Sequence, residues 1–542
     1  MASFTKADRQ HRIILLLVYL YVLILAMMII AVPPGFDPDS GWGFMVMHNM
    51  EQGAAFNRLI SPDPANIAAN QTVFLAWWSP GQYLVPYFLK ILFRVTSGHA
   101  ISLTIAGSYL SGLAGFYLLF RKFGFNKLVA ALSIGFVATQ LFFIQQFVYY
   151  NGGELLIFAF LGWFLYGCFS FERVTWKTVL FIFFAGLIGF FLKSSALWML
   201  AAGAGCIWLN ISVSETGHLP AGANLRSAFL LKKTVPVFLR NGALVFFPLV
   251  AVYMVISFFY LSKGGNPSNI SGPFRFAPEV FLFPLASPFT SAFSIDELFD
   301  GLIYQPDGQT LSHHLAMVIL FVLTLLSLLY AWLLMKFRPA RNYLVAFLSF
   351  FMVGCLFFGW MFLKQFPISY EARHFRIIGL LAIPGFIQLL YRRTFGKVIF
   401  FVGWAVFTYV GFAYFIREFA DNRNAARGSL GLSQQNYDTA TMKEILRLDN
   451  RYPNKAVFVV MSPEIGAEIT HNRVIAIDPE MASSGDFSKI TYKGRSGRLF
   501  ILVPGALMAK NGDPPILKSF AGYHHFASKQ LSPDFYLYSA ED

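Results

Sequence analysis

The stretch IILLLVYLYVLILAMMIIAV, residues 13–32, decides the fold class of this chain. It is an unbroken apolar run, and about 20 such residues in a helix cross the hydrocarbon core of a bilayer. Basic residues precede it, as in a secretory signal, but a signal has a shorter apolar core of about 7–15 residues and a small-residue cleavage site. This run ends instead in Pro33 and Pro34. We therefore expect a retained membrane anchor.

The composition extends this conclusion to the whole chain. Of its 542 residues, 56% are hydrophobic and only 13% are charged, which is far from the composition of a soluble globular protein. The net charge of +14 does not indicate nucleic acid, because the basic residues form short clusters between apolar runs rather than one extended face. The three cysteines fall inside apolar runs, where we interpret them as small buried side chains. The sequence predicts a polytopic membrane protein with no nucleic-acid partner.

About eleven apolar runs are long enough to be membrane spans. They lie near residues 13–32, 100–120, 128–147, 154–171, 177–192, 195–210, 242–261, 313–335, 343–363, 375–391 and 397–416. Basic clusters fall on every second connection between them. These clusters are Arg121, Lys122 and Lys127; Arg173 and Lys177; Arg226, Lys232, Lys233 and Arg240; Lys336, Arg338 and Arg341; and Arg392, Arg393 and Lys397. Since positive charge marks cytoplasmic loops, we expect a cytoplasmic N-terminus and, with an odd number of spans, a C-terminus outside.

The longer connections collect on the outer side of this topology. They are residues 33–99, the turn QQFVYYNGGE (145–154), residues 263–312, the turn KQFPISYEARHFR (364–376) and the segment after Arg417. A transporter that alternates access usually has internal repeats and compact loops on both faces. An enzyme that meets its substrates at one face concentrates its chain there, and this chain shows that pattern.

The composition shifts toward that of a soluble domain after about residue 416. The segment DTATMKEILRLDNRYP, 438–453, predicts a helix capped near Asp438, and four later segments predict strands. The four segments are NKAVFVVMS (454–462), NRVIAID (472–478), GRLFILVPG (497–505) and DFYLYS (534–539). We expect residues 1–416 to form a membrane domain, with its first outer loop over 33–99, and residues 417–542 to form a small extracytoplasmic α/β domain.

Two acids follow the first span directly, in the stretch PPGFDPDSGWGFMVMHNMEQG, residues 33–53. Its apolar and polar residues separate onto two sides of a helix, which predicts an amphipathic helix lying in the membrane interface with Asp39 or Ser40 as its cap. A carboxylate at a helix start also suits the helix dipole. Capping and a functional role for Asp39 are equally compatible with this pattern.

The next stretch, FLAWWSPGQYLVPYFLK, residues 74–90, holds aromatic residues that are typical of a membrane interface. Taken alone, it favours an aromatic belt that includes Trp78, with a turn at Pro80 and Gly81. The turn leads into another apolar segment, which we expect to be a short helix.

The order of these features resembles the first extracytoplasmic loop of GT-C glycosyltransferases that use polyprenyl-phosphate sugars, in particular the aminoarabinose transferases and protein O-mannosyltransferases. An acid follows the first span, an interfacial helix ends in Gly53, and an aromatic turn with a proline leads into a short apolar helix. The basic loop 121–127 and the turn GLIGFFLKSSALWML, 186–200, which carries Lys193, continue the resemblance. It covers about the first 210 residues by pattern and the rest of the chain by topology.

The resemblance implies an all-α, GT-C-like membrane fold and transfer of one sugar from a polyprenyl-phosphate carrier to a lipid, glycan or protein acceptor outside a bacterial inner or plasma membrane. In that superfamily the first-loop aspartate acts as general base or helps to hold a metal. Asp39 matches this position, with Asp37 as the alternative. A second acid often stands beside that aspartate, and this chain has Ser40 there. A divalent cation therefore stays an open question, and no other cofactor is expected.

Such a transfer also needs cations, because the departing phosphate gains charge in the transition state. The turn YEARHFR supplies Arg373, His374 and Arg376 on the outer side, where basic residues go against the positive-inside trend. Arginine matches phosphate through its planar fork. Lys193 is the fourth predicted ligand of the carrier phosphate. The alternative for these residues is local ion pairing, for example with Glu371, and snorkelling to lipid headgroups.

Five residues are predicted to contact the substrates: Glu154, Tyr150, Asn151, Trp78 and Arg275. Glu154 and its neighbours are of the side-chain types that line sugar sites, although an acid that opens a span also caps the helix. Arg275 lies in a glycine-rich outer loop that could order on binding. Two rival functions are a polysaccharide polymerase or ligase using diphosphate-linked glycans, and a lipid or solute transporter. A transporter would carry charges near the middle of several spans, whereas this chain keeps nearly all of them at span ends.

Overall fold

The computed structural model describes residues 6–35, 38–150, 152–216, 234–264, 271–305, 308–337, 340–508 and 513–541. The chain divides into two compact units. The first unit comprises Met1–Leu25, Ala106–Val148 and Gly153–Ile416, and the second comprises Ala26–Ile105, Tyr149–Gly152 and Arg417–Asp542. The helices α1 (Lys6–Ala31), α4 (Ser97–Lys122) and α17 (Thr394–Asn424) belong partly to each unit.

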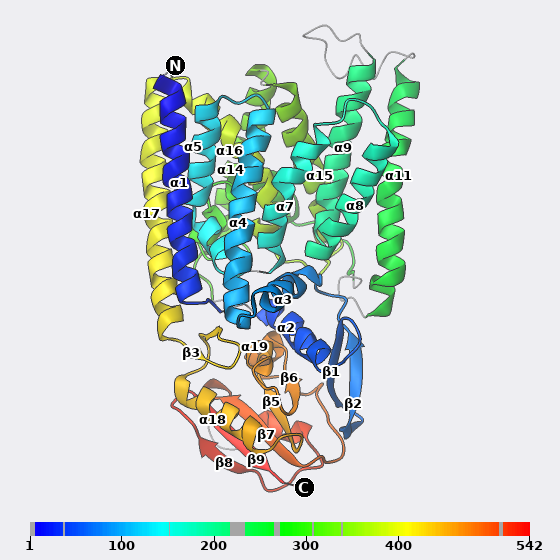
Figure 1. Cartoon of the computed structure of the whole chain (residues 1–542), viewed down its shortest axis with the longest axis vertical. Coiled ribbons are helices and arrows are strands. Elements are labelled where there is room, and N and C mark those ends of the chain that lie inside the picture. Colours follow the sequence, from blue (N-terminus) through cyan, green and yellow to red (C-terminus); the bar gives the residue numbers. More distant parts are fainter. Residues whose placement is uncertain are drawn as a thin grey trace. The chain divides into compact units, whose positions relative to one another are not determined.

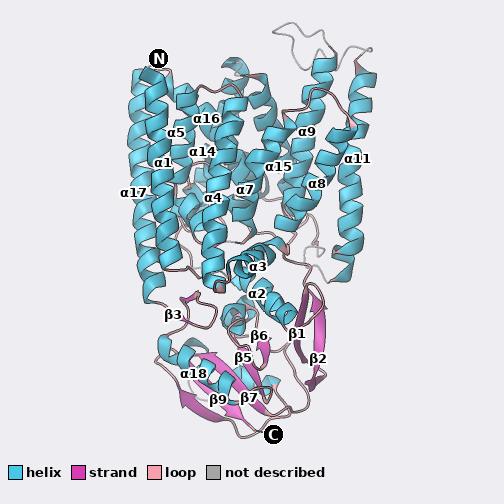
Figure 2. Ribbon diagram, viewed as in Figure 1, coloured by secondary structure: helices cyan, strands magenta, loops and turns pink. Residues whose placement is uncertain are grey.

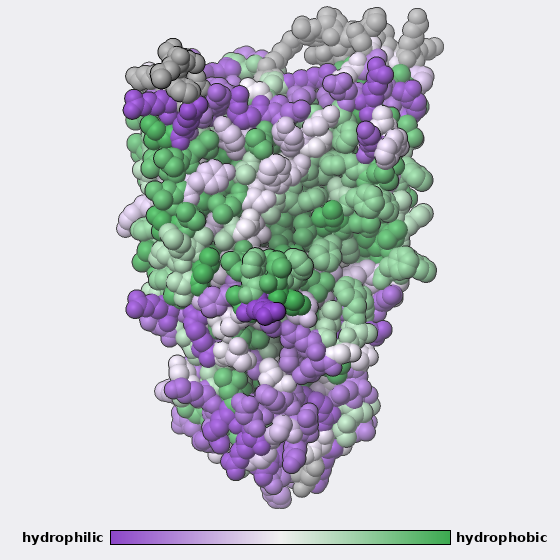
Figure 3. All heavy atoms as spheres, viewed as in Figure 1, coloured by the Kyte–Doolittle hydropathy of each residue, from purple (hydrophilic) through white to green (hydrophobic). Residues whose placement is uncertain are grey.

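The first unit is a bundle of helices that run side by side (Figure 1). Besides α1, α4 and α17, its helices of ten residues or more are α5 (Lys127–Ala138), α7 (Gly153–Cys168), α8 (Trp176–Leu192), α9 (Ala196–Glu215), α11 (Val235–Phe259), α12 (Pro278–Thr290), α14 (His313–Phe337), α15 (Arg341–Leu363) and α16 (Arg376–Tyr391). Short elements are α6 (Leu141–Phe143), a π-helical turn at Ile144–Val148, α13 (Ile295–Leu298) and 3-10 turns at Leu261–Lys263 and Ala372–Phe375. Hydrophobic side chains cover the visible outer face of this bundle, which fits a lipid environment (Figure 3).

In the described part of the chain, eight helices are long and apolar enough to cross a membrane. The count rises to nine if α5 and residues 141–148, a pair bent by 64°, form one span, and α7 and α8 are shorter apolar helices. These elements account for the apolar runs that the sequence predicts as spans. The polytopic helical membrane fold is therefore confirmed, and the bend within the run 128–147, which falls at Thr139 and Gln140, is not among the sequence predictions.

The interhelical connections that carry the basic clusters lie at one end of this bundle, as contacts between them show. The guanidinium of Arg392 lies 4.8 Å from the ring centre of Phe337. Phe123 packs against Phe169 and Tyr343, with ring centres 5.2 Å and 5.9 Å apart. Arg341 donates a hydrogen bond from Nη2 to the carbonyl of Asn210 at 3.0 Å. The connections after α4, α7, α9, α14 and α16 therefore share one end. Of the predicted basic residues, Arg226, Lys232, Lys233 and Arg338 lie outside the described residues.

The second unit contains the strands of the chain that the structure describes (Figure 2). Its main sheet has five strands in the order β6-β5-β7-β9-β8. Their bounds are β5 (Ala456–Val460), β6 (Arg473–Ala476), β7 (Arg498–Pro504), β8 (Ala527–Gln530) and β9 (Phe535–Ala540). β5 pairs in parallel with β6 and β7, and the other pairs are antiparallel. The four predicted strands are confirmed, whereas the exposed edge strand β8 is not among the sequence predictions.

The helix predicted beside this sheet is α18 (Thr439–Arg451). Asp438 precedes it in an extended conformation, and its side chain accepts hydrogen bonds from the amides of Ala440 and Thr441, both at 2.9 Å. These bonds satisfy amides that have no partner within the helix. The predicted cap at Asp438 is therefore confirmed.

The first outer loop also belongs to the second unit. It forms the helix α2 (Pro38–Glu51), a hairpin of β1 (Arg58–Asp63) and β2 (Asn66–Phe74), and the helix α3 (Gly81–Phe93). Ile67 of the hairpin is fully buried in the hydrophobic core of the main sheet, and its amide donates to the carbonyl of Lys493 at 2.8 Å. The sequence predicts the two helices but not the hairpin. The first loop and the C-terminal segment thus share one core.

Candidate active site

The first unit holds a small cavity that combines ionisable and apolar side chains. Its ionisable lining residues are Glu154, Lys193, Arg373, His374 and Arg376. Its apolar lining residues include Phe147, Ile157, Phe158, Leu161, Met199, Ile377 and Leu380. The cavity measures about 30 Å³, so it has room for water but not for a lipid headgroup while the side chains keep these positions. The structure thus brings together all four predicted phosphate ligands and one predicted substrate ligand.

Secondary structure positions these groups at helix ends. Glu154 lies in the first turn of α7, as its helix-capping role predicts, and Lys193 is the residue that follows α8. Arg373 and His374 lie in the 3-10 turn that leads into α16, and Arg376 is the first residue of α16. Three helices thus deliver their terminal side chains to the same place.

Glu154 and Lys193 form the central ion pair of the cavity. The side chain of Glu154 is only 8% exposed, and its Oε1 atom also lies 4.0 Å from Nε of Arg373. Two cations therefore face one carboxylate. Because a buried charge needs compensation, this arrangement is a local site for a single anionic group, which the carboxylate of Glu154 occupies.

A second carboxylate, that of Glu371, orients Arg373. Nη2 of Arg373 donates to Oε2 of Glu371 at 2.9 Å. The ring of His374 stacks on Phe358 with centres 5.7 Å apart, and its Nε2 lies 4.0 Å from the same Glu371 oxygen. The predicted alternative of local ion pairing is thus observed for Arg373, whose side chain nevertheless keeps 24% of its surface exposed.

Arg376 differs from Arg373 because it is held on every side. Its Nη1 donates to the carbonyl of Ser291, its Nη2 pairs with Glu297, and its Nε donates to Oε1 of Gln146 at 3.2 Å. The guanidinium also lies 4.0 Å from the ring centre of Phe142. With 4% exposure, Arg376 supports the wall of the cavity, and its hydrogen-bonding capacity is largely used within the protein.

Three polar residues of this network are absent from the sequence predictions: Gln146, Asp296 and Glu297. Nε2 of Gln146 donates to Glu297 at 3.1 Å. Asp296 accepts hydrogen bonds from the amides of Leu302 at 2.9 Å and Ala372 at 2.8 Å, which fastens α13 to the turn before α16. Adjacent acids in the otherwise apolar segment 283–303 are the sequence signal that could have identified this pair.

The buried Arg376–Glu297 pair gives a stability prediction. Replacing one member leaves the other as an uncompensated buried charge, which costs about 3–5 kcal/mol. We expect Arg376→Met to lower the free energy of unfolding by about that amount, measured by denaturant titration of the protein in detergent. The double variant Arg376→Met with Glu297→Leu removes both charges, and we expect it to recover much of the loss. A single variant as stable as the parent would show that the pair does not support the fold.

The predicted general base lies in the second unit. α2 begins at Pro38, so Asp39 lies within its first turn, half-buried, rather than preceding the helix as a cap. The helix ends as predicted, because the amide of Gly53 donates to the carbonyl of Met50 at 3.0 Å and Gly53 has a φ of +92°. Asp37 lies outside the described residues.

Close packing fixes α2 within its unit. A Cβ atom at Gly43 would lie 2.6 Å from Cδ1 of Tyr83 in α3, and one at Gly41 would lie 3.0 Å from the amide nitrogen of Glu464. Ser40 is 1% exposed and approaches Gly152 of the turn 149–152. Three separate segments of the second unit thus hold the turn that carries Asp39.

This packing predicts the effect of a single methyl group. Gly43→Ala would force α2 away from Tyr83, and overpacking of this kind costs about 1–3 kcal/mol. We expect Gly43→Ala to lower the thermal midpoint of unfolding, measured on the purified protein in detergent. The matched control is Gly107→Ala in α4, where the added Cβ meets no atom within 4 Å. Equal behaviour of the two variants would contradict this account.

The remaining predicted residues occupy different settings. Tyr150 is 3% exposed; its hydroxyl donates to the carbonyl of Gln82 and its ring packs edge-on against Phe44 at 6.4 Å. Trp78 is half-buried in the loop before α3. Arg275 pairs with Glu279 at 3.1 Å and does not line the cavity of the first unit. Asn151 lies outside the described residues.

Among the described residues, no group of three or more His, Cys, Asp or Glu side chains is placed to hold a metal ion. The histidines and cysteines of the described chain therefore supply no preformed metal site.

No protein-family model matches this chain, and no curated protein matches it in sequence. Among solved structures, the chain is similar to ArnT from Cupriavidus metallidurans in the apo state, with 12% sequence identity and a TM-score of 0.45. It is also similar to ArnT from the same organism bound to undecaprenyl phosphate, with 10% identity and a TM-score of 0.43. Each alignment covers 97% of this chain and 97% of the ArnT chain.

The apolar helices of the first unit define a multi-pass membrane protein. A group of buried and half-buried ionisable side chains lies among their ends, and a close-packed loop with an acidic residue belongs to the second unit.

Proposed function

We propose that this protein is a membrane glycosyltransferase that moves a monosaccharide from a polyprenyl-phosphate carrier to an extracytoplasmic acceptor. The observation that carries the proposal is the convergence of Lys193 and Arg373 on the carboxylate of Glu154, in a cavity with apolar walls. A lipid phosphate combines an anionic head with an apolar chain, which match the charges and the apolar walls of this cavity. Because the cavity measures only about 30 Å³, its side chains must move apart to admit the lipid. The resemblance of the first loop supplies the donor class.

The position of the cation group along the helices supports an outer location for the chemistry. Glu154 opens α7, whose other end leads to Phe169 beside the basic loop after α4. Arg376 opens α16, whose other end leads to the basic Arg392. If the basic loops are cytoplasmic, as the positive-inside rule requires, the cavity faces the outer side of the membrane.

The donor phosphate would replace the carboxylate of Glu154 between the two cations. Arg373 offers a planar fork for two phosphate oxygens, and Lys193 offers a mobile point charge. His374 extends the polar wall, and Arg376 holds that wall in place from behind. The isoprenoid chain would follow the apolar residues that line the rest of the cavity.

The transfer itself forms a bond between the acceptor oxygen and the anomeric carbon while the bond from that carbon to the phosphate oxygen breaks. The polyprenyl phosphate leaves with the bonding electrons, and the two cations stabilise its added negative charge. Asp39 takes the proton of the acceptor hydroxyl as general base. Asp37 is the alternative base, and Glu154, Tyr150, Asn151, Trp78 and Arg275 are proposed to contact the sugar or the acceptor.

The acceptor class stays broad in this proposal: a lipid, a glycan or a protein. The N-terminus would be cytoplasmic, and residues 417–542 would form an extracytoplasmic domain beside a membrane domain of residues 1–416. The hydrophobic core that the first loop shares with the C-terminal segment supports a role for that domain in holding the loop in its folded form.

A transfer assay tests the proposal. Purified protein in detergent is supplied with a panel of polyprenyl monophosphate sugars, a mixture of acceptors and, separately, a diphosphate-linked glycan. We expect turnover with at least one monophosphate donor and loss of that turnover in Asp39→Asn. Turnover with the diphosphate donor alone would instead favour a polymerase or ligase.

A further inference from the structure

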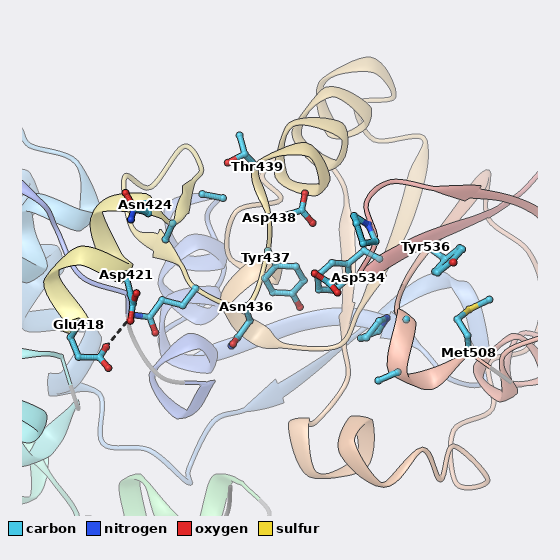
Figure 4. Close-up of a pocket in the computed structure, with 18 residues that line it drawn as sticks. Glu418, Asp421, Asn424, Asn436, Tyr437, Asp438, Thr439, Met508, Asp534 and Tyr536 are labelled. Carbon is cyan, nitrogen blue, oxygen red and sulfur yellow. Dashed lines mark hydrogen bonds between the residues drawn. The ribbon is translucent and has the colours of Figure 1, made fainter. Parts of the chain in front are cut away.

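A large open pocket lies within the second unit, apart from every residue assigned above to the transfer reaction. It measures about 920 Å³, which is within the range of about 300–1,000 Å³ that is typical of ligand sites. Its walls come from the end of α17, the segment 435–439 that leads into α18, residues 504–508 after β7, and residues 533–536 at the start of β9 (Figure 4).

Aromatic side chains form one side of this pocket. Tyr437 and Phe535 are nearly fully buried and stack with ring centres 4.9 Å apart and an interplanar angle of 24°. The hydroxyl of Tyr437 donates to Oγ of Ser462 at 3.3 Å, which fixes its ring. Tyr536 is half-buried and also lines the pocket (Figure 4). Because Tyr437 and Phe535 are nearly fully buried against each other, Tyr536 is the aromatic lining residue that can offer its ring to a sugar.

Amide and carboxylate groups form the other sides. The amides belong to Asn424, Gln435 and Asn436, and the carboxylates to Glu418, Asp421, Asp438 and Asp534 (Figure 4). Among the residues that line this pocket in the described chain, none is Lys, Arg or His. The pocket therefore offers many hydrogen-bond acceptors and a negative potential, which disfavours phosphates and acidic sugars.

Two of the carboxylates have local roles, and two do not. Asp438 caps α18, and Glu418 accepts a hydrogen bond from Gln435 at 3.3 Å. Asp421 and Asp534 are exposed at the pocket and make no ion pair with any residue of the described chain. The carboxylates also do not form a compact metal-binding group among the described residues. Their spacing around an aromatic wall suits a larger cationic ligand better than a bare ion.

We propose that this pocket binds a saccharide that carries free amino groups. The ring of Tyr536 would stack on a sugar ring, and the amide groups would donate hydrogen bonds to its hydroxyls. The carboxylates would accept hydrogen bonds from those hydroxyls, and Asp421 and Asp534 would pair with its ammonium groups. Binding at this pocket requires no donor lipid and no catalysis. It can therefore be tested independently of the transfer reaction.

Binding of three matched oligosaccharides to the full-length protein in detergent tests this inference by calorimetry, with no donor present. The probes are a glucosamine tetramer, its N-acetylated counterpart and a galacturonic acid tetramer. We expect the cationic tetramer to bind most tightly, the neutral one more weakly and the acidic one not at all. Equal binding of all three, or binding of none, would overturn the proposal.

Variants assign the binding to the pocket. Because exposed charge pairs are individually weak, we expect the double variant Asp421→Asn with Asp534→Asn to weaken binding of the glucosamine tetramer by about three- to tenfold and to leave the neutral tetramer unchanged. Tyr536→Ala is expected to weaken both by about tenfold through lost stacking. The control is Asp486→Asn, an exposed acid of the same unit that does not line the pocket.

A lysine tetrapeptide serves as the competing ligand. If it binds as tightly as the glucosamine tetramer and responds to the same aspartate variants but not to Tyr536→Ala, the pocket recognises cationic peptides and the saccharide assignment is wrong.

Discussion

Asp39→Asn is expected to lower kcat by about 10²–10⁴-fold, because general base catalysis contributes a factor of that size, while the donor KM stays within about twofold of the parent value. The amide keeps the size and shape of the carboxylate but cannot take the proton of the acceptor. The phosphate ligands of the donor lie on other elements and are unchanged by this substitution. The measurement is sugar transfer at saturating acceptor, with the donor concentration varied.

Two companion variants make this result specific. Asp37→Asn is expected to keep most of the activity, and the reverse pattern would move the base assignment to Asp37. Ser40→Ala removes a hydroxyl next to Asp39 and tests whether this neighbour supports the base; since Ser40 is buried, its effect is expected in stability more than in kcat. Full activity of both Asp39→Asn and Asp37→Asn would remove the first-loop acids from the mechanism.

Arg373→Met and Lys193→Met are expected to show the second large effect. Each removes one of the two cations around the anion position, and loss of one such group costs about 10²–10³-fold in kcat. The donor KM should rise as well, because both cations contact the phosphate before and during transfer. Arg373→Lys keeps the charge but loses the fork, so we expect an intermediate activity. Transfer kinetics and direct binding of polyprenyl phosphate measure the two contributions.

The variant Glu154→Gln distinguishes phosphate binding by Lys193 and Arg373 from a role of these residues in protein stability alone. In the free protein, the carboxylate of Glu154 neutralises Lys193 and Arg373. Its removal should tighten binding of polyprenyl phosphate, since the phosphate no longer competes with it for the cations. The matched control is Lys364→Met, a lysine after α15 whose Nζ lies 4.0 Å from the ring centre of Phe274 and not in the cavity. If Lys364→Met and Lys193→Met reduce phosphate binding equally, the cavity is not the donor site.

Elements with strong local signals could be predicted from the sequence. Unbroken apolar runs become the long helices because only a hydrogen-bonded helix satisfies the backbone in lipid. Asp438 is found as a cap because its partners lie within three residues. Gly53 ends α2 for the same kind of local reason, since its positive φ suits glycine.

Features that depend on distant partners were not predictable in this way. The bend between α5 and α6 falls at Thr139 and Gln140, two polar residues within an otherwise apolar stretch, and no proline or glycine marks a break there. The hairpin of β1 and β2 contains polar residues on both faces, and its buried Ile67 gains its partners from the C-terminal sheet. In the candidate site, the sequence indicated Arg373 and Lys193 by their unusual position. It could not indicate Gln146 and Glu297, whose role depends on meeting Arg376.

The shared core of the first loop and the C-terminal segment has a consequence for biogenesis. Arg473 donates from Nη1 to the carbonyl of Ile67 at 2.8 Å, across 406 residues of sequence. During synthesis the first loop is therefore complete long before its packing partners leave the ribosome, and it must wait for them without its native neighbours. A chain that stops after the last membrane helix would leave the Asp39 loop permanently in that immature state, because the missing segment supplies its packing partners.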